Sequence, residues 1–249
     1  MLGQIIALAL LCQPVVSLHL RSSRSGYGPD FNLFVFTRWW PQTQCQINAD
    51  ADWRFTQPSL NKTCVPQGIT EWTIHGLWPT VGKEHAPVFC NSSWPFDESL
   101  VEDLRPQLEQ QWPSFDRDYD NPAFWKHEWE KHGTCSTDLD YLNSEHKYFA
   151  VTLLLNGYYD LFRALAKSGI TPSSEKTYKV KDIESALQEY FGVYPIVECL
   201  IKGPVQMLSS VELCLDKQLN LTNCLESAPE CNYDKVVQYP PIVPVYDFA

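Results

Sequence analysis

The sequence predicts an α+β fold, in which an antiparallel β-sheet packs against several α-helices within a single disulfide-stapled domain. Three observations support this class. Segments in the middle of the chain have the apolar spacing of helices, whereas segments before and after them alternate in the manner of strands. Eight cysteines, an even number, follow residue 17. No internal repeat or low-complexity linker divides the 249 residues.

The first 17 residues are apolar and uncharged, and they end in a small residue. This composition is typical of a secretory signal peptide, although the usual basic start is absent. The segment is short for a membrane span, and no other stretch is apolar enough to cross a bilayer. We therefore expect a protein without a membrane span that is secreted or delivered to the lysosomal lumen. Its domain should occupy residues 18–249, with a core at about 31–235.

The expected elements follow one another along the chain. Strands are expected at residues 33–40 and 72–74, where aromatic and β-branched residues gather, with His75 at or near the end of the second. Helices are expected at residues 97–111, 122–132, 144–167 and 181–191. Alternating residues from 196 to 215 predict further strands, and the tail from residue 236, rich in proline and tyrosine, is expected to be irregular.

The helix at residues 122–132 has an ionisable face and an aromatic face. Asn121 is expected to be its N-cap, and Gly133 is expected to end it in a left-handed conformation. At about 100° per residue, one arc of about 140° holds His127, Glu128, Lys131 and His132. Trp125 and Trp129 lie toward the other side, where we expect them to anchor the helix in the core.

Three kinds of site could account for this ionisable face. A solvated charged surface is the commonest outcome of a charge run, but two histidines between tryptophans are unusual for one. A zinc protease needs histidines four residues apart, whereas His127 and His132 are five apart, so we expect them to be splayed too far to share a metal ion. Acid–base chemistry on a phosphate fits better, because histidines transfer protons near neutral pH and a lysine can bind the anion.

A second histidine-bearing segment, residues 75–79, reads His-Gly-Leu-Trp-Pro. Taken alone, His75 would also fit a structural role. Together, residues 75–79 and residues 124–135 closely resemble the two active-site segments of the ribonuclease T2 family, in the order expected for that family. With the cysteine pattern included, the resemblance extends from about residue 31 to the C-terminal region.

The resemblance implies an endoribonuclease that cleaves single-stranded RNA by attack of the ribose 2′-OH on its own 3′-phosphate, giving a 2′,3′-cyclic phosphate and then a 3′-phosphate. His132 would be the base and His75 the acid. Glu128 and Lys131 would stabilise the transition state, and His127 would hold the phosphate. DNA lacks the 2′-OH and should be inert. No metal or other cofactor is expected, and activity should peak at about pH 4.5–6.

Three further residues are candidates for binding a nucleobase: Trp78, Phe124 and Arg38. In the family the tryptophan of the first segment lies in a base pocket, although Trp78 and Phe124 would also suit the core. Arg38 stands where many members have glutamine, and it could meet either a phosphate or a base. Thr80 stands where members often carry Asp or Asn, which leaves the base preference open.

The eight cysteines allow 105 pairings, and spacing alone cannot choose among them. The family resemblance implies the bonds Cys45–Cys64, Cys90–Cys135, Cys199–Cys231 and Cys214–Cys224. In a secreted chain, the sequons at Asn61, Asn91 and Asn220 are candidates for N-glycosylation.

The formal net charge of −11 argues against a protein that coats RNA, because such binding depends on Lys and Arg at phosphates. An enzyme with a small, locally positive site remains compatible with it. The alternative function is a secreted glycoprotein that binds a partner or signals, with nuclease activity secondary. The intact set of His75, Glu128, Lys131 and His132 favours the enzyme, which we expect to act as a monomer.

Overall fold

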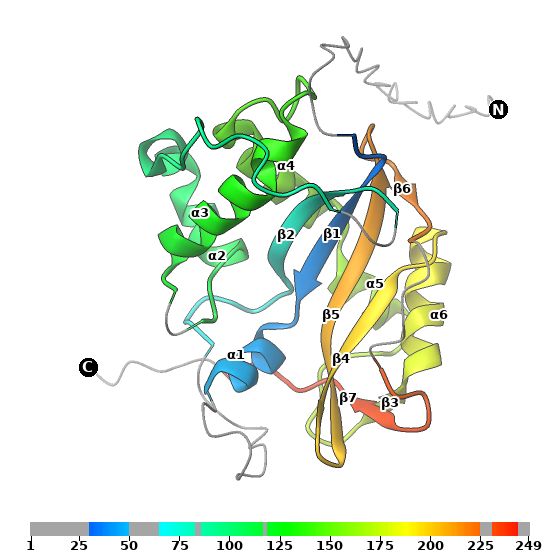
Figure 1. The fold of residues 1–249 in the computed structure, drawn as a ribbon. Coiled ribbons are helices and arrows are strands. Elements are labelled where there is room, and N and C mark those ends of the chain that lie inside the picture. The colour runs from blue at the N-terminus through cyan, green and yellow to red at the C-terminus, as the bar shows by residue number, and fades with distance from the viewer. Residues whose placement is uncertain (1–29, 50–64, 83–85, 117–118, 225–230, 244–249) are drawn as a thin grey trace, which may run out of the picture.

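A seven-stranded β-sheet runs through the computed structural model, which describes residues 30–49, 65–82, 86–116, 119–224 and 231–243 (Figure 1). The strands are β1 (Leu33–Trp39), β2 (Thr73–Thr80), β3 (Thr177–Lys179), β4 (Ile196–Lys202), β5 (Val205–Asp216), β6 (Leu221–Thr222) and β7 (Val236–Gln238). Their order is β2-β1-β5-β7-β3, and β4 and β6 also pair with β5. All pairs are antiparallel except β5 with β7. The predicted α+β class is therefore confirmed.

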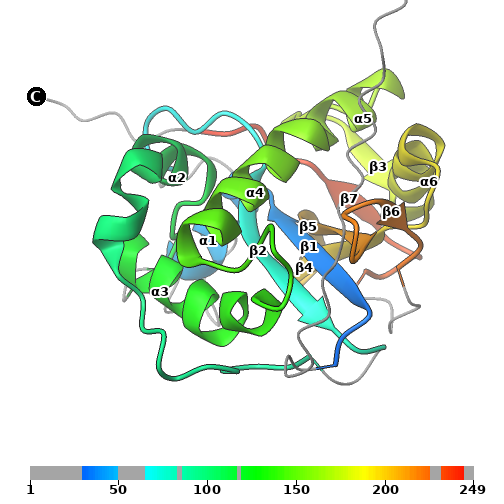
Figure 2. The same ribbon diagram turned by 90° about the horizontal axis from the view of Figure 1, so that it is seen from above.

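Apart from α1 (Pro41–Ala49), which lies against β5, the α-helices form two groups around this sheet. They are α2 (Arg105–Gln111), α3 (Asn121–Lys131), α4 (Glu145–Tyr158), α5 (Leu161–Lys167) and α6 (Val180–Phe191), with the 3₁₀ helices η1 (Glu98–Leu104) and η2 (Gly133–Ser136). Helices α2, α3 and α4 gather beside β2, whereas α6 lies beside β3 and β4, next to α5 (Figures 1 and 2). The first group forms one wall of the candidate site.

Two of the predicted helices are each divided in the structure. Residues 97–111 form η1 and α2, with Pro106 in the first turn of α2, where its missing N–H is tolerated. Residues 144–167 form α4 and α5, because Asp160 starts a new helix by accepting a hydrogen bond from the Arg163 N–H at 2.8 Å. Helix α6 ends at Gly192, which has φ 76°, as predicted.

Two segments differ from the sequence prediction. The tail from Val236 was expected to be irregular. Its first three residues instead form β7, because Val237 is buried in the core and the strand pairs with β3 and β5, whereas residues 239–243 are irregular as expected. Helix α1 was not predicted, since its polar sequence has no apolar stripe.

Tryptophans dominate the core between the sheet and the first group of helices. Trp125 and Trp129 are fully buried, as predicted, and they fix α3 against its neighbours. Both indole N–H groups donate to backbone carbonyls, Trp125 to Trp112 at 2.8 Å and Trp129 to Trp94 at 3.0 Å. Because buried indoles need an acceptor, these bonds hold α3 in one rotation about its axis.

The structure contains three of the four disulfides that the family resemblance implied: Cys90–Cys135, Cys199–Cys231 and Cys214–Cys224. Cys45 is also disulfide-bonded, and its expected partner, Cys64, lies outside the described residues, as do Asn61 and the proposed signal peptide. Cys90–Cys135 ties the segment after β2 to the turn that follows α3. Among the described residues, no helix is both long and apolar enough to cross a membrane.

Candidate active site

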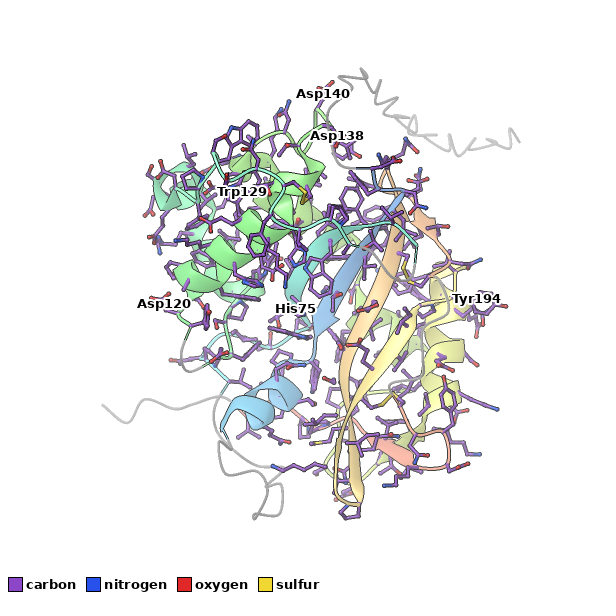
Figure 3. All side chains as sticks on the ribbon, in the orientation of Figure 1. His75, Asp120, Trp129, Asp138, Asp140 and Tyr194 are labelled. Carbon is purple, nitrogen blue, oxygen red and sulfur yellow. A yellow bond between two sulfur atoms is a disulfide. The ribbon has the colours of Figure 1, made fainter. Side chains whose placement is uncertain are left out.

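His75 lies within β2 instead of at its end. The pairing of β1 with β2 shifts between Thr37, opposite Gly76, and Arg38, opposite Ile74, so His75 is the extra residue of a β-bulge. A bulge bends the strand and turns the side chain of its extra residue. The backbone carbonyl of His75 also accepts a hydrogen bond from Trp112 Nε1 at 2.8 Å, which ties the bulge to the segment after α2. Figure 3 shows His75 on the sheet, beside the helical wall.

Helix α3 begins one residue earlier than predicted. Asp120, labelled in Figure 3, is the N-cap and accepts a hydrogen bond from the Ala123 N–H at 2.9 Å. Asn121 instead binds the Ser114 N–H through its side-chain oxygen at 2.7 Å, which connects α3 to the preceding loop. Two side-chain hydrogen bonds, one accepted by Asp120 within the first turn and one accepted by Asn121 from the preceding loop, therefore fix the start of the helix.

The end of α3 also differs from the prediction. Gly133 is not left-handed; it starts the 3₁₀ turn η2, and His132 is the C-cap, with φ −116° and ψ −48°. Glycine is needed there for another reason, because a Cβ would lie 2.4 Å from Cε3 of Trp129. His132 consequently projects from the end of the helix and not from its regular side.

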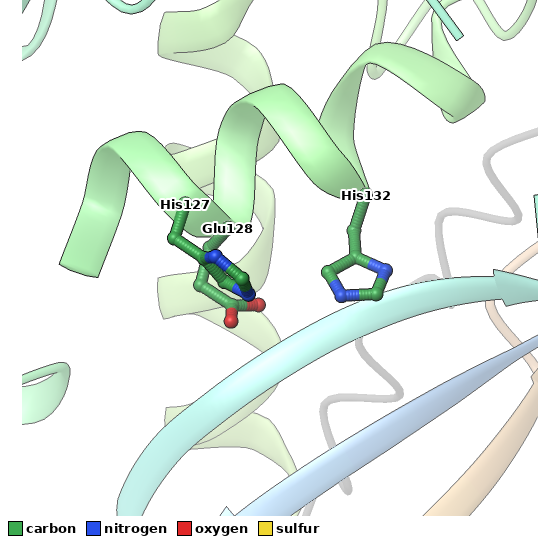
Figure 4. Close-up of side chains that lie close together, drawn as sticks. All are labelled: His127, Glu128 and His132. Carbon is green, nitrogen blue, oxygen red and sulfur yellow. The ribbon is translucent and has the colours of Figure 1, made fainter. Parts of the chain in front are cut away.

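This position brings His132 close to both Glu128 and His127, although an ideal helix would splay the two histidines. One ligand atom each from His127, Glu128 and His132 lie within 4.8 Å of one another (Figure 4). The expectation that the spacing keeps the histidines too far apart to share a metal ion is therefore wrong. Two imidazoles and a carboxylate form a donor set that suits zinc.

Trp78 lies between the two histidines that the resemblance pairs. Its ring centroid is 4.6 Å from that of His75 and 5.2 Å from that of His132. Its Nε1–H donates to Oε2 of the buried Glu128 at 2.9 Å. A Cβ on Gly76 would lie 2.1 Å from that nitrogen and 2.2 Å from that oxygen. Gly76 therefore makes room for this hydrogen bond between β2 and α3.

Burial governs the protonation of the site. It raises the pKa of Glu128 to about 8, opposed by the hydrogen bond from Trp78 and the charge of Lys131. Burial, followed by Lys131 and His127, lowers the pKa of His132 to about 3. The pKa of His75 also lies well below its ordinary value, because of burial and then the charges of His132, His127 and Lys131. In the free protein at neutral pH, these shifts favour the neutral imidazoles of His75 and His132 and the protonated carboxyl of Glu128.

A cavity of about 410 Å³ opens beside these groups, and its wall includes His75, His127 and Glu128. Of the two predicted aromatic residues, Phe124 lines this cavity, together with Trp39 and Phe115, which the sequence reading missed. Trp39 adjoins Arg38 in β1 and faces the opposite side of the strand, so strand alternation was the signal that could have identified it.

Arg38 is not brought to this site. It is buried, and its guanidinium donates to the backbone carbonyls of Trp72, Asn156 and Tyr159 at 3.2, 3.3 and 3.0 Å. It lines a separate cavity of about 330 Å³ whose wall includes none of the four catalytic candidates. The structure therefore does not support Arg38 as a base-binding residue, because the strand turns its side chain to the other face of the sheet.

Comparison with known families settles the relationship suggested by these segments. The model of the ribonuclease T2 family matches residues 31–224. The chain belongs to the ribonuclease T2 family. Membership confirms the enzyme class expected from the sequence, a ribonuclease T2-like endoribonuclease.

Individual members of the ribonuclease T2 family agree with this match. Ribonuclease T2 of Sus scrofa is 44% identical over 217 residues, which cover 85% of this chain and 98% of the relative. Ribonuclease T2 of Danio rerio is 34% identical over 236 residues, covering 86% and 89%. Among solved structures, human RNase T2 has a TM-score of 0.67 and 35% identity, covering 85% of this chain and 99% of its own. RNase NT in complex with 5′-AMP has a TM-score of 0.70 and 28% identity, covering 86% and 100%.

Proposed function

We propose that this chain cleaves single-stranded RNA by transesterification, with His132 as the base and His75 as the acid. The main support is that the imidazoles of His75 and His132, which come from different elements, both approach the indole ring of Trp78, with centroid distances of 4.6 and 5.2 Å. A phosphodiester bound beside Trp78 would have one histidine on each flank. General acid–base catalysis requires this arrangement, since one proton leaves the nucleophile while another reaches the leaving group.

The reaction uses only groups of the substrate and the chain. His132 takes the proton of the 2′-OH as the 2′-oxygen bonds to phosphorus, and His75 gives its proton to the 5′-oxygen as the P–O5′ bond breaks. The roles then exchange: His75 takes a proton from the water that opens the cyclic phosphate, and His132 returns its proton to the 2′-oxygen. The final product ends in a 3′-phosphate. DNA has no 2′-OH and is not cleaved, and no cofactor is involved.

An acidic pH optimum follows from the two protonation requirements. His132 must be neutral, and its pKa of about 3 allows this over most of the pH range. His75 must be protonated, and its lowered pKa confines that form to acid solution. The negative charge of a bound phosphodiester raises the pKa of both imidazoles. We therefore propose a bell-shaped profile with a maximum at about pH 4.5–6.

The remaining groups act on the phosphate and the bases. Because burial raises the pKa of Glu128 to about 8, its neutral carboxyl does not repel the phosphodiester at the working pH. Together with the charge of Lys131, it stabilises the phosphorane-like transition state. His127 holds the phosphate. Trp78 and Phe124 offer aromatic surface to a nucleobase.

We also propose that the protein is monomeric and that it works in the extracellular space or the lysosomal lumen. Its disulfides suit an oxidising compartment. Asn91 and Asn220 are proposed to carry N-glycans, since Asn220 is exposed and Asn91 is half-exposed.

The test is to incubate the purified protein with RNA and DNA oligonucleotides between pH 4 and 9 in EDTA and to identify the product ends. We expect cyclic and 3′-phosphates from RNA alone, and a loss of about 10²–10⁴-fold in His75→Ala and His132→Ala. His146→Ala is the matched control, because His146 bonds to Asp103 at 2.9 Å and does not line the cavity. Near-normal turnover by His132→Ala would contradict the base assignment, and a maximum above pH 8 would contradict both roles.

A further inference from the structure

Aromatic rings hold the imidazole of His75. Trp39, the last residue of β1, stacks on it with centroids 3.7 Å apart and planes 26° apart. Trp78 meets it at 4.6 Å and 84°, in a T-shaped contact. Within the described part of the chain, no side chain forms a hydrogen bond with this imidazole. Its orientation therefore depends on ring contacts.

Trp39 is itself fixed by rings behind it. The Phe124 ring lies nearly parallel to the indole, 5.7 Å away at 6°, and Phe115 packs at 6.3 Å and 59°. Both phenylalanines are buried. In the sheet, Trp39 pairs with Thr73, two residues before His75, and the bulge then brings His75 alongside it. The indole is thus part of a rigid wall.

The charges around His75 oppose its protonated form. The titratable groups near it are His127, Glu128, Lys131 and His132 at α3, and Asp116 and Tyr119 in the loop before that helix. His132, His127 and Lys131 all lower the pKa of His75. Glu128 offers little negative charge below its own pKa of about 8, and Asp116 is exposed to solvent. An acid at this position needs another source of stabilisation.

We propose that Trp39 is a positioning residue for the proton donor: its indole face orients the His75 imidazole and stabilises the imidazolium that delivers the proton to the leaving 5′-oxygen. This role presupposes the ribonuclease reaction proposed above. A cation over the face of tryptophan is stabilised by about 0.5–2 kcal/mol, which corresponds to about 2- to 30-fold in rate. A phenylalanine at position 39 would attract the cation more weakly through its aromatic face, whereas a leucine would retain only the apolar volume.

The decisive experiment compares two substrates that differ in their need for an acid. A dinucleoside phosphate has a poor leaving group that must be protonated, whereas uridine 3′-(4-nitrophenyl phosphate) releases a nitrophenolate that leaves without a proton. We expect Trp39→Leu to lower kcat/KM by about 2- to 30-fold on the first substrate and by less than about 2-fold on the second. Trp39→Phe should lie between Trp39→Leu and the parent on the first substrate.

Three reference variants separate the possible failures. His75→Ala should show the same substrate dependence more strongly, and His132→Ala should lose activity on both substrates. Trp94→Leu controls for loss of a half-exposed indole, because Trp94 stacks on Trp129 and does not line the cavity. If the parent protein cleaves neither substrate, the proposed function fails. If it does cleave them and Trp39→Leu affects both substrates equally, or neither, only the role of Trp39 is overturned.

A measurement on the parent protein tests the contact without any variant. Protons of an imidazole stacked on an indole are shifted upfield in the NMR spectrum, so the His75 ring protons should resonate upfield of those of His146. The same spectra give the pKa of His75 by titration, which should fall in Trp39→Leu and change less in Trp39→Phe. Unshifted His75 ring protons would overturn the proposal even if the leucine variant failed to fold.

Discussion

Replacing Gly76 with alanine tests the contact that joins the two halves of the site. The added Cβ would lie 2.1 Å from Trp78 Nε1 and 2.2 Å from Glu128 Oε2, so at least one of these atoms must move. Those two atoms form the 2.9 Å hydrogen bond between the indole and the buried carboxyl, which cannot survive the insertion. Leaving a buried polar group unpaired costs about 1–3 kcal/mol, equivalent to about 5- to 150-fold in rate if expressed in the transition state.

We expect Gly76→Ala to lower kcat/KM on a dinucleoside phosphate by at least this factor, because a displaced Trp78 also disturbs both flanking histidines. Gly157→Ala is the matched control, since nothing lies within 4 Å of a Cβ at that position in α4. It should leave activity unchanged and raise stability by up to about 1 kcal/mol. Thermal unfolding of both variants separates loss of the site from loss of the fold. A folded Gly76→Ala variant with activity within about threefold of the parent would refute the reasoning.

Three further perturbations have defined outcomes. Burial raises the pKa of Glu145 to about 7, so the folded state binds this proton more tightly than the unfolded state, and the contribution of Glu145 to stability falls as the pH rises from about 4.5 to 7. Denaturant unfolding at pH 5 and 8 should therefore show that Glu145→Gln stabilises the protein by about 1–3 kcal/mol at pH 8 only. Excess zinc should inhibit cleavage reversibly, because His127, Glu128 and His132 can share an ion; an unchanged rate would argue against their shared geometry. Lys131→Ala should move the acidic limb of the pH–rate profile to higher pH, since Lys131 lowers the pKa of His132; a limb displaced to lower pH would contradict this.

Features set by local geometry were predictable from the sequence. The ionisable face of α3 and the opposite anchors Trp125 and Trp129 follow from helical periodicity, which depends only on the order of residues. The C-cap of α6 at Gly192 follows from the conformational freedom of glycine.

Features set by distant partners were not predictable. His75 lies in a bulge because of the register between β1 and β2, which belongs to two segments far apart in sequence. Glycine is required at position 133 because Trp129 packs against it, and not because the chain turns into a left-handed conformation there. The helix consequently ends at His132. Strand alternation separates Arg38 from Trp39, but only the position of α3 decides which of the two faces the site.

His75 belongs to the sheet and His132 to the end of a helix, so the site spans the contact between β2 and α3. The Trp78–Glu128 hydrogen bond crosses this contact, and the Cys90–Cys135 disulfide joins the segment after β2 to the turn after α3. Local opening at the end of α3 requires less free energy than unfolding of the whole core, and it would separate the two histidines. The enzyme should therefore lose its ribonuclease activity on heating at a temperature where circular dichroism still reports a native fold.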